Sequence, residues 1–126
     1  MVTRNRLYLC GPMTGLPDYN YPAFARAAGL LRGYGYSLFS PAENGLPAHA
    51  PWVVHMRRDI PELLQCAGVA TLPGVESSRG AQLELRIATD LHMTVATVDE
   101  WLESARRHRA TAHPTTAYSP MTGEPL

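Results

Sequence analysis

Four short, almost wholly apolar runs alternate along this chain with segments that have the periodicity of amphipathic helices. We expect the runs to be strands, and they span residues 6–10, 36–39, 68–72 and 93–96. Strands that are apolar on both sides and separated by helices are typical of a parallel sheet covered on both faces. The alternation therefore predicts an α/β fold.

The helices between these runs are marked by their own signals. Asn20 is placed to cap a helix with Pro22 in its first turn, and Gly33 and Gly35 end it. The inner stripe predicted for this helix is Phe24, Ala27, Ala28 and Leu31. A second helix covers 52–66, in one piece or broken at Asp59 and Pro61, and a third covers 78–91. Thr97 and Glu100 form a capping box for a last helix. We predict a single-domain, three-layer, doubly wound parallel sheet of Rossmann or flavodoxin type with four to five strands.

Length and charge restrict the class of protein. A chain of 126 residues is one domain, predicted over 1–109, and the aperiodic tail 110–126 is either disordered or docked on a neighbouring subunit. Eleven basic and eleven acidic side chains cancel, which argues against a nucleic-acid-binding protein. No signal peptide or apolar run of ~20 residues is seen, so we expect a cytoplasmic protein without membrane contact. Cys10 and Cys66 are interpreted as buried thiols, and the five histidines indicate no metal site; no cofactor is expected.

Unusual segments follow three of the predicted strands, at residues 11–16, 41–43 and 73–80. Parallel sheets bind ligands at the carboxyl ends of their strands, so these segments are expected to converge on one site. The first contains Gly11, Pro12, Met13, Thr14 and Gly15. It lacks the lysine of a P-loop and the spacing of a dinucleotide motif, so it either cups a sugar or phosphate or is a tight turn without a ligand. Residues 43–51 are long enough for a lid.

The helix predicted over 78–91 carries an acidic residue on its apolar side. Glu84 lies near the middle of an arc formed by Ala81, Leu83, Leu85, Ile87, Ala88 and Leu91. A carboxylate facing a core costs several kcal/mol unless it is paired, hydrogen-bonded or protonated. At the start of this helix, Ser77, Ser78 and Gly80 place small residues and free N–H groups nearby, which favours an anion site.

Other candidate residues have two interpretations each. Tyr8 is a core aromatic unless its hydroxyl reaches the acid, and Asp59 is either a solvated helix charge or a functional acid. Arg79 opposes the helix dipole unless an anion is bound there. Asn20 is a ligand-binding group or a helix cap. Trp52 either stacks on a base or anchors the long loop.

Four segments together resemble a known family: Tyr-Leu-Cys-Gly-Pro-Met-Thr-Gly, Phe-Ser-Pro-Ala-Glu, Arg-Arg-Asp-Ile and Ser-Arg-Gly-Ala-Gln-Leu-Glu. They are similar to the nucleoside 2-deoxyribosyltransferase superfamily, in particular its small branch common in phages and prophages, from about Leu7 to Val98. The family includes deoxyribosyltransferases and 2′-deoxynucleoside 5′-phosphate N-hydrolases, which use a glutamate nucleophile. The chain departs from the family at Ala67, where many relatives carry Asp, and near Ser77 and Ser78, where transferases carry a second aspartate.

The resemblance implies a role for each matching residue. Glu84 matches the nucleophile, Tyr8 the tyrosine that holds it, and Asp59 the aspartate that handles the proton of the leaving base. Gly11 and the following residues match a ligand-cupping loop, and Ser78 and Gly80 match groups that hold a 5′-phosphate. Tyr8 and nearby backbone amides are expected to keep the pKa of Glu84 from rising, so that the nucleophile is ionised.

From these residues we predict a retaining N-glycosidase acting on 2′-deoxynucleoside 5′-monophosphates, with hydrolysis preferred over base transfer. The preference for a phosphate depends on Ser78, Arg79 and Gly80. The alternatives are a nucleoside 2-deoxyribosyltransferase and a non-catalytic nucleotide sensor. The expected partner is a small nucleotide or nucleoside substrate, and the resemblance implies a homodimer or higher homo-oligomer.

Overall fold

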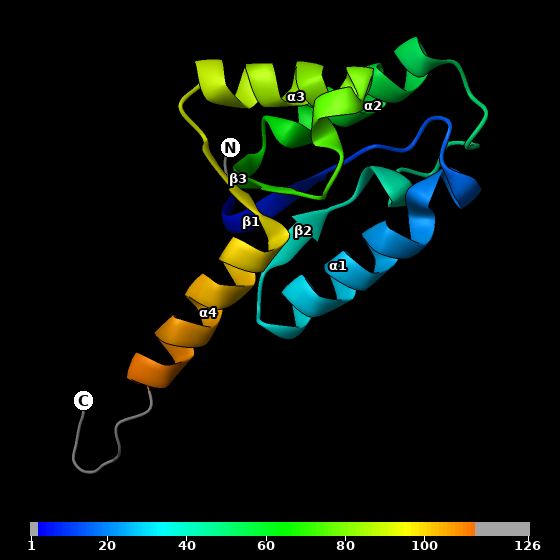
Figure 1. Ribbon diagram of the computed structural model, residues 1–126. Helices are drawn as coiled ribbons and strands as arrows, with labels where there is room; N and C mark the ends of the chain where they lie inside the picture. Colours follow the sequence, from blue (N-terminus) through cyan, green and yellow to red (C-terminus); the bar gives the residue numbers. More distant parts are fainter. Residues whose placement is uncertain (1–2, 113–126) are drawn as a thin grey trace.

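The computed structural model of the protein describes residues 3–112, which contain a four-stranded parallel sheet (Figure 1). Its strands are β1 (Thr3–Cys10), β2 (Ser37–Phe39), β3 (Cys66–Thr71) and β4 (Thr94–Thr97), in the order β2-β1-β3-β4. Every neighbouring pair is parallel. The four predicted strands are confirmed, with β1 three residues longer at its start than the apolar run indicated.

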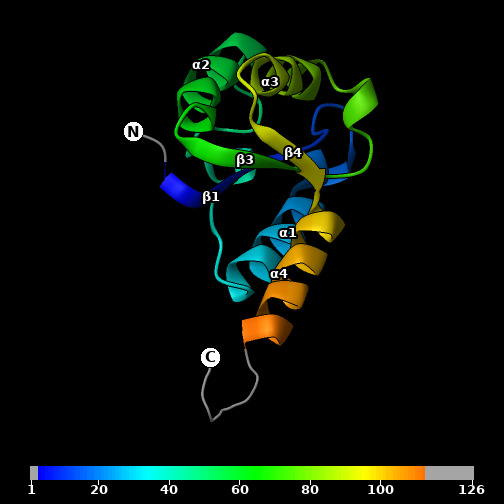
Figure 2. The same cartoon turned by 90° about the vertical axis from the view of Figure 1, so that its left-hand side faces the viewer.

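Four α-helices connect the strands and cover both faces of the sheet. They are α1 (Tyr21–Gly33), α2 (Trp52–Leu63), α3 (Arg79–Asp90) and α4 (Val98–Ala112). Three short 3-10 helices, η1 (Pro17–Asn20), η2 (Pro41–Glu43) and η3 (Val75–Ser77), lie in the loops after β1, β2 and β3. Helices α1 and α4 lie on one face, and α2 and α3 lie on the other (Figures 1 and 2). The predicted three-layer α/β architecture is confirmed.

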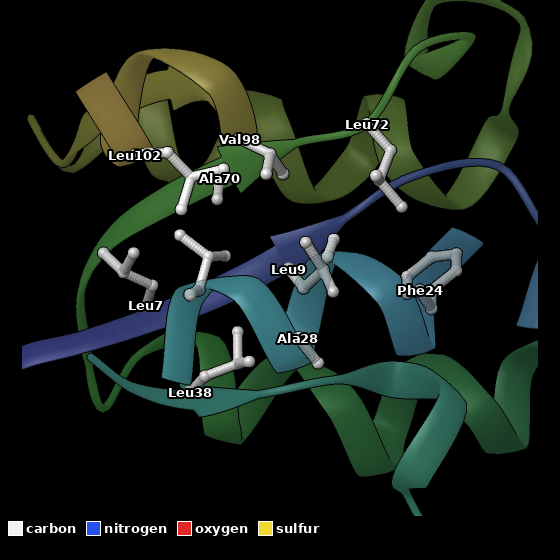
Figure 3. Packing of buried hydrophobic residues seen from close by; sticks show 11 residues of the cluster. Leu7, Leu9, Phe24, Ala28, Leu38, Ala70, Leu72, Val98 and Leu102 are labelled. Carbon is white, nitrogen blue, oxygen red and sulfur yellow. The ribbon is translucent and has the colours of Figure 1, made fainter. Parts of the chain in front are cut away.

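Side-chain alternation along β1 divides the core into two halves. Leu7 and Leu9 point toward α1 and α4, where they pack with apolar residues such as Phe24 (Figure 3). Tyr8 and Cys10 point to the opposite face and pack in the cluster under α2 and α3, which contains Ala81 and Ala88. The same strand therefore supplies one face with plain aliphatic groups and the other with two polar atoms.

The helix signals in the sequence are largely confirmed. The stripe predicted for α1 is buried at all four positions: Phe24, Ala27, Ala28 and Leu31. At the start of α4, Glu100 N donates to Thr97 Oγ1 at 3.0 Å, and Thr97 N donates to Glu100 Oε1 at 2.8 Å, as in a capping box. On α3, the buried positions are Ala81, Glu84 and Ala88, whereas Leu91 lies past the end of the helix and is exposed.

The structure decides between the two alternatives for the second helix, and it contradicts the capping hydrogen bond expected of Asn20. Pro61 does not break α2, which runs from Trp52 to Leu63 with the proline inside its last turn. Pro61 and Arg57 both lie on the exposed side of α2, so water can satisfy the carbonyl that loses its helical partner. Asn20 precedes α1 but makes no capping hydrogen bond, because its own backbone is left-handed, with a φ of 62°.

The end of the chain also differs from the predicted boundary. Helix α4 continues through Arg109 to Ala112, so the proposed division at 109/110 falls inside a helix. The two interpretations of the tail concern residues 113–126, which lie outside the described residues. Between residues 3 and 112, none of the helices has both the length and the apolar character that spanning a membrane requires.

Candidate active site

A cavity of about 370 Å³ opens at the carboxyl edge of the sheet. Its walls come from the segments after β1, β2 and β3, from the loop that precedes α2, and from α2 and α3. The predicted convergence of residues 11–16, 41–43 and 73–80 on one site is therefore confirmed, with Gly11, Pro41 and Ser78 as representatives. The wall also contains Met13, Thr14, Tyr19, Tyr21, Ala48, His49, Ala50, Trp52, His55, Met56, Asp59, Gly80, Ala81 and Glu84.

Glu84 lies in the wall of this cavity with only 5% of its surface exposed. Tyr8 Oη donates a hydrogen bond to Glu84 Oε2 at 2.5 Å, and Cys10 Sγ donates to Glu84 Oε1 at 3.4 Å. Because Tyr8 and Cys10 are two residues apart on β1, they present their donors on the same face of the sheet. Each carboxyl oxygen of Glu84 thus has its own donor, and the two contacts fix the orientation of the group.

Burial dominates the electrostatics of Glu84. It raises the pKa of this carboxyl to about 7, although the hydrogen bonds from Tyr8 and Cys10 act in the opposite direction. The charge of Asp59 raises the pKa further. The expectation that hydrogen bonds would prevent this rise was wrong, since both donors in the described chain are side chains and no backbone amide joins them. Burial and the Glu84 charge also raise the pKa values of Tyr8 and Cys10, which keeps both groups protonated as donors.

Asp59 is a second buried carboxyl in the wall, with 3% exposure. Burial raises its pKa, and a hydrogen bond from Asn44 Nδ2 to Asp59 Oδ1, at 2.9 Å, opposes the rise. Asn44 Nδ2 also lies 3.0 Å from Nδ1 of His55, one turn before Asp59 on α2. The interpretation of Asp59 as a solvated helix charge is excluded by this burial. Two buried carboxyls, Glu84 and Asp59, therefore face one cavity.

The loop after β1 is held in place by contacts outside the cavity. Gly11 packs so closely on Leu72, the residue after β3, that an added Cβ would lie 2.9 Å from Leu72 Cβ. Gly11, Met13 and Thr14 line the cavity, whereas Pro12 and Gly15 do not. Asn20, also outside the wall, donates from Nδ2 to the carbonyl of Pro12 at 3.0 Å. Asn20 therefore supports the loop and does not line the cavity, contrary to its predicted role in binding.

Three consecutive residues, Asp18, Tyr19 and Asn20, have left-handed backbones with φ between 50° and 62°. Such a conformation costs roughly 1–2 kcal/mol for each residue that is not glycine, although Asp and Asn tolerate it better than most. The turn brings Tyr19 and Tyr21 to the cavity wall, with ring centroids 6.1 Å apart. Asp18 and Asn20 were available signals for such a turn, but three consecutive left-handed residues were not predicted.

The N-terminus of α3 forms the opposite side of the cavity. Ser78 caps the helix, since its Oγ accepts from Ala81 N at 3.2 Å, and Ser78 and Gly80 both line the wall. Arg79 is exposed and outside the wall, and its guanidinium lies over the Trp52 ring, 3.6 Å from the centroid. Trp52 itself lines the cavity. This cation–π contact holds a positive charge next to a residue of the cavity wall.

Three residues of the site were missed at the level of sequence. Cys10 was predicted to be a buried free thiol, which is confirmed, but its contact with Glu84 was not predicted. Asn44 and His55 were not proposed at all. His55 and Asp59 are four residues apart on a predicted helix, which places both on one face and was an available signal. Within residues 3–112, the structure contains no cluster of three or more His, Cys, Asp or Glu side chains suited to a metal ion.

A family model matches a region of the chain that contains most of the residues of this site. Residues 5–97 match the family described as Domain of unknown function (DUF4406), and the chain belongs to that family. A comparison with curated proteins finds no match. The matched region contains Tyr8, Asn44, Asp59 and Glu84, so both buried carboxyls and their hydrogen-bond partners lie inside the family domain.

Proposed function

We propose that this protein is a retaining N-glycosidase that releases the base from 2′-deoxynucleoside 5′-monophosphates. One observation carries the proposal: Glu84 is buried in a cavity wall with its two oxygens held separately by Tyr8 and Cys10. Among the described residues no Arg forms an ion pair with Glu84, so no cation holds the carboxylate away from a ligand in the cavity. The resemblance to deoxyribosyltransferases supports the same role.

The two carboxyls suit displacement at an anomeric carbon. Departure of a base from C1′ passes through an oxocarbenium-like state, which Glu84 traps as a covalent glycosyl ester on the face opposite the base. Asp59 gives its proton to the leaving base, a step that contributes roughly 10²–10⁴ in rate when a general acid is well placed. Water then attacks C1′ and gives its proton to the Asp59 carboxylate, the bond to Glu84 breaks, and the sugar is released with net retention of configuration.

Support for a 5′-monophosphate comes from the start of α3. The first turn of a helix leaves N–H groups without helical partners, and here Ser78 and Gly80 face the cavity. Arg79 adds a positive charge that Trp52 holds nearby. A phosphate fits this environment better than a free 5′-hydroxyl, which favours nucleotides over nucleosides as substrates.

Base release tests the proposal directly. Purified protein is incubated with the four 2′-deoxynucleoside 5′-monophosphates, the matching deoxynucleosides and ribonucleotides, and free base is followed by chromatography. We expect release from at least one deoxynucleotide and none from Glu84→Ala, whose fold is checked by circular dichroism. A new nucleoside formed when a second base is added would favour a transferase. Binding without cleavage would favour a nucleotide sensor and contradict the proposal.

We also propose that the protein is cytoplasmic, as the sequence led us to expect, and that it forms the homodimer or higher homo-oligomer that the resemblance implies. Exposed apolar side chains on the first turn of α2, Val53 and Val54, adjoin Trp52 in the cavity wall and are candidates for a subunit contact. Analytical ultracentrifugation of the full chain tests pairing, for which a concentration-independent monomer is the contrary result.

A further inference from the structure

Asn44 is a buried amide, 6% exposed, in the loop that leads from β2 to α2. The backbone N–H of Leu46 donates to Asn44 Oδ1 at 3.0 Å, and this contact identifies the oxygen end of the amide. The nitrogen end must then face the interior, where Nδ2 donates to Asp59 Oδ1 at 2.9 Å and lies 3.0 Å from His55 Nδ1. The two hydrogens of this amide therefore have two acceptors.

The protonation of His55 follows from its two contacts. His55 Nε2 lies 3.0 Å from the carbonyl oxygen of Pro47, which can only accept, so Nε2 carries the hydrogen. His55 Nδ1 is then free to accept from Asn44. The donors and acceptors agree along the whole series, from the Pro47 carbonyl through His55 and Asn44 to Asp59.

We infer that Asn44 and His55 are positioning residues for Asp59, which direct its proton to the oxygen that faces the leaving base. This inference rests on the proposed function. Because Asp59 Oδ1 already accepts from Asn44, the proton of the neutral carboxyl belongs on Oδ2. Within residues 3–112, Oδ2 makes no hydrogen bond to the protein, and Asp59 lines the cavity.

The amide also acts during proton transfer. As the bond between C1′ and the base breaks, its electron pair stays on the base, and the proton moves from Asp59 Oδ2 to the base nitrogen. Asp59 becomes a carboxylate, and the hydrogen bond from Asn44 becomes charge-assisted and about twice as strong. Asn44 therefore stabilises the charge that develops in the transition state more than it stabilises the neutral ground state.

The same network extends to the loop that covers the cavity. Pro47, whose carbonyl accepts from His55, directly precedes Ala48, His49 and Ala50 in the cavity wall. The segment that encloses the substrate is thereby joined to the group that orients the acid. A displacement of this loop would disturb His55 first, then Asn44 and Asp59.

Leaving groups of different basicity test the inference. We compare wild type with Asn44→Ala on a deoxynucleotide substrate and on a 4-nitrophenyl 2-deoxyriboside 5-phosphate, whose leaving group departs without a proton. We expect kcat for base release to fall by about 10- to 100-fold, with KM little changed, and kcat for nitrophenolate release to fall less than about 3-fold. Glu43→Gln is the matched control, because Glu43 is adjacent but contacts Arg32 and not Asp59.

The other outcomes contradict either the inference alone or the proposed function together with it. A merely structural role of Asn44 would lower both activities alike, and an unchanged kcat for base release would exclude positioning. If Asn44→Ala fails to fold, His55→Gln provides the second variant, with a smaller fall in kcat that is again confined to the basic leaving group. Wild-type protein that releases neither base nor nitrophenolate would overturn the proposed function and this inference with it. Activity on both substrates with no dependence on the leaving group would overturn the inference alone.

Discussion

Replacing Glu84 by glutamine isolates the cost of keeping an ionised carboxylate in the core. Burial raises the pKa of Glu84 from the ordinary 4.5 to about 7. At about 1.4 kcal/mol per pH unit, this interval corresponds to roughly 3 kcal/mol in the free energy of unfolding. Because the folded state holds the proton more tightly than the unfolded chain, the stability from this group is full below about pH 4.5 and is lost as the pH rises through about 7. Glutamine has the same shape and does not titrate.

Urea denaturation at pH 5 and pH 8 measures this effect. Relative to wild type, Glu84→Gln should gain roughly 2 to 3 kcal/mol of stability between pH 5 and pH 8, while its base-release activity is lost. The substitution changes the hydrogen bonding of residue 84 equally at both pH values. This change therefore cancels when the free energies of unfolding at pH 5 and pH 8 are subtracted. Glu76→Gln, at an exposed position before α3, is the control and should show no such gain. If Glu84→Gln and wild type have the same pH dependence, Glu84 is not a buried titrating carboxyl and the reasoning fails.

Three further predictions concern the surroundings of Glu84 and the packing of the sheet. Tyr8→Phe removes the 2.5 Å hydrogen bond that lowers the pKa of Glu84, so the acid limb of the pH–rate profile should move to higher pH; an unmoved limb would contradict the contact. Arg79→Gln should raise KM for a deoxynucleotide about 10- to 100-fold and leave the matching deoxynucleoside unchanged, as expected for a lost charged hydrogen bond; equal effects on both would exclude a phosphate contact. Gly68→Ala places a Cβ 2.9 Å from the Trp101 ring and should cost about 1–3 kcal/mol of stability in urea denaturation; wild-type stability would be the contrary result.

Periodicity was enough to predict the parts of this structure that depend on local pattern. The buried stripe of α1 and the inward position of Glu84 both follow from 3.6 residues per turn, and both are confirmed. The edge of the sheet that carries the site follows from the alternation of strands and helices. These features need only the order of residues along one helix or strand.

Features that depend on contacts between distant segments were not predicted. Asn44 reaches Asp59 because the loop before α2 folds back against that helix, and no local sequence pattern indicates this contact. The pKa of Glu84 was misjudged because the number of hydrogen-bond donors can be guessed from neighbours, whereas the extent of burial cannot. Whether Pro61 breaks the second helix was left open because the sequence does not show that its side of α2 faces water.

Detection of a covalent sugar on Glu84 is the most direct test of the central claim. Protein mixed with a substrate deoxynucleotide is quenched in acid within milliseconds, digested, and analysed by mass spectrometry of the peptide that contains α3. We expect this peptide to gain the mass of a deoxyribose phosphate on Glu84. The adduct should be absent from wild-type protein without substrate, and in Tyr8→Phe it should fall in proportion to the turnover of that variant. Free base that accumulates while the peptide from rapidly quenched wild-type protein stays unmodified would contradict a glutamate nucleophile.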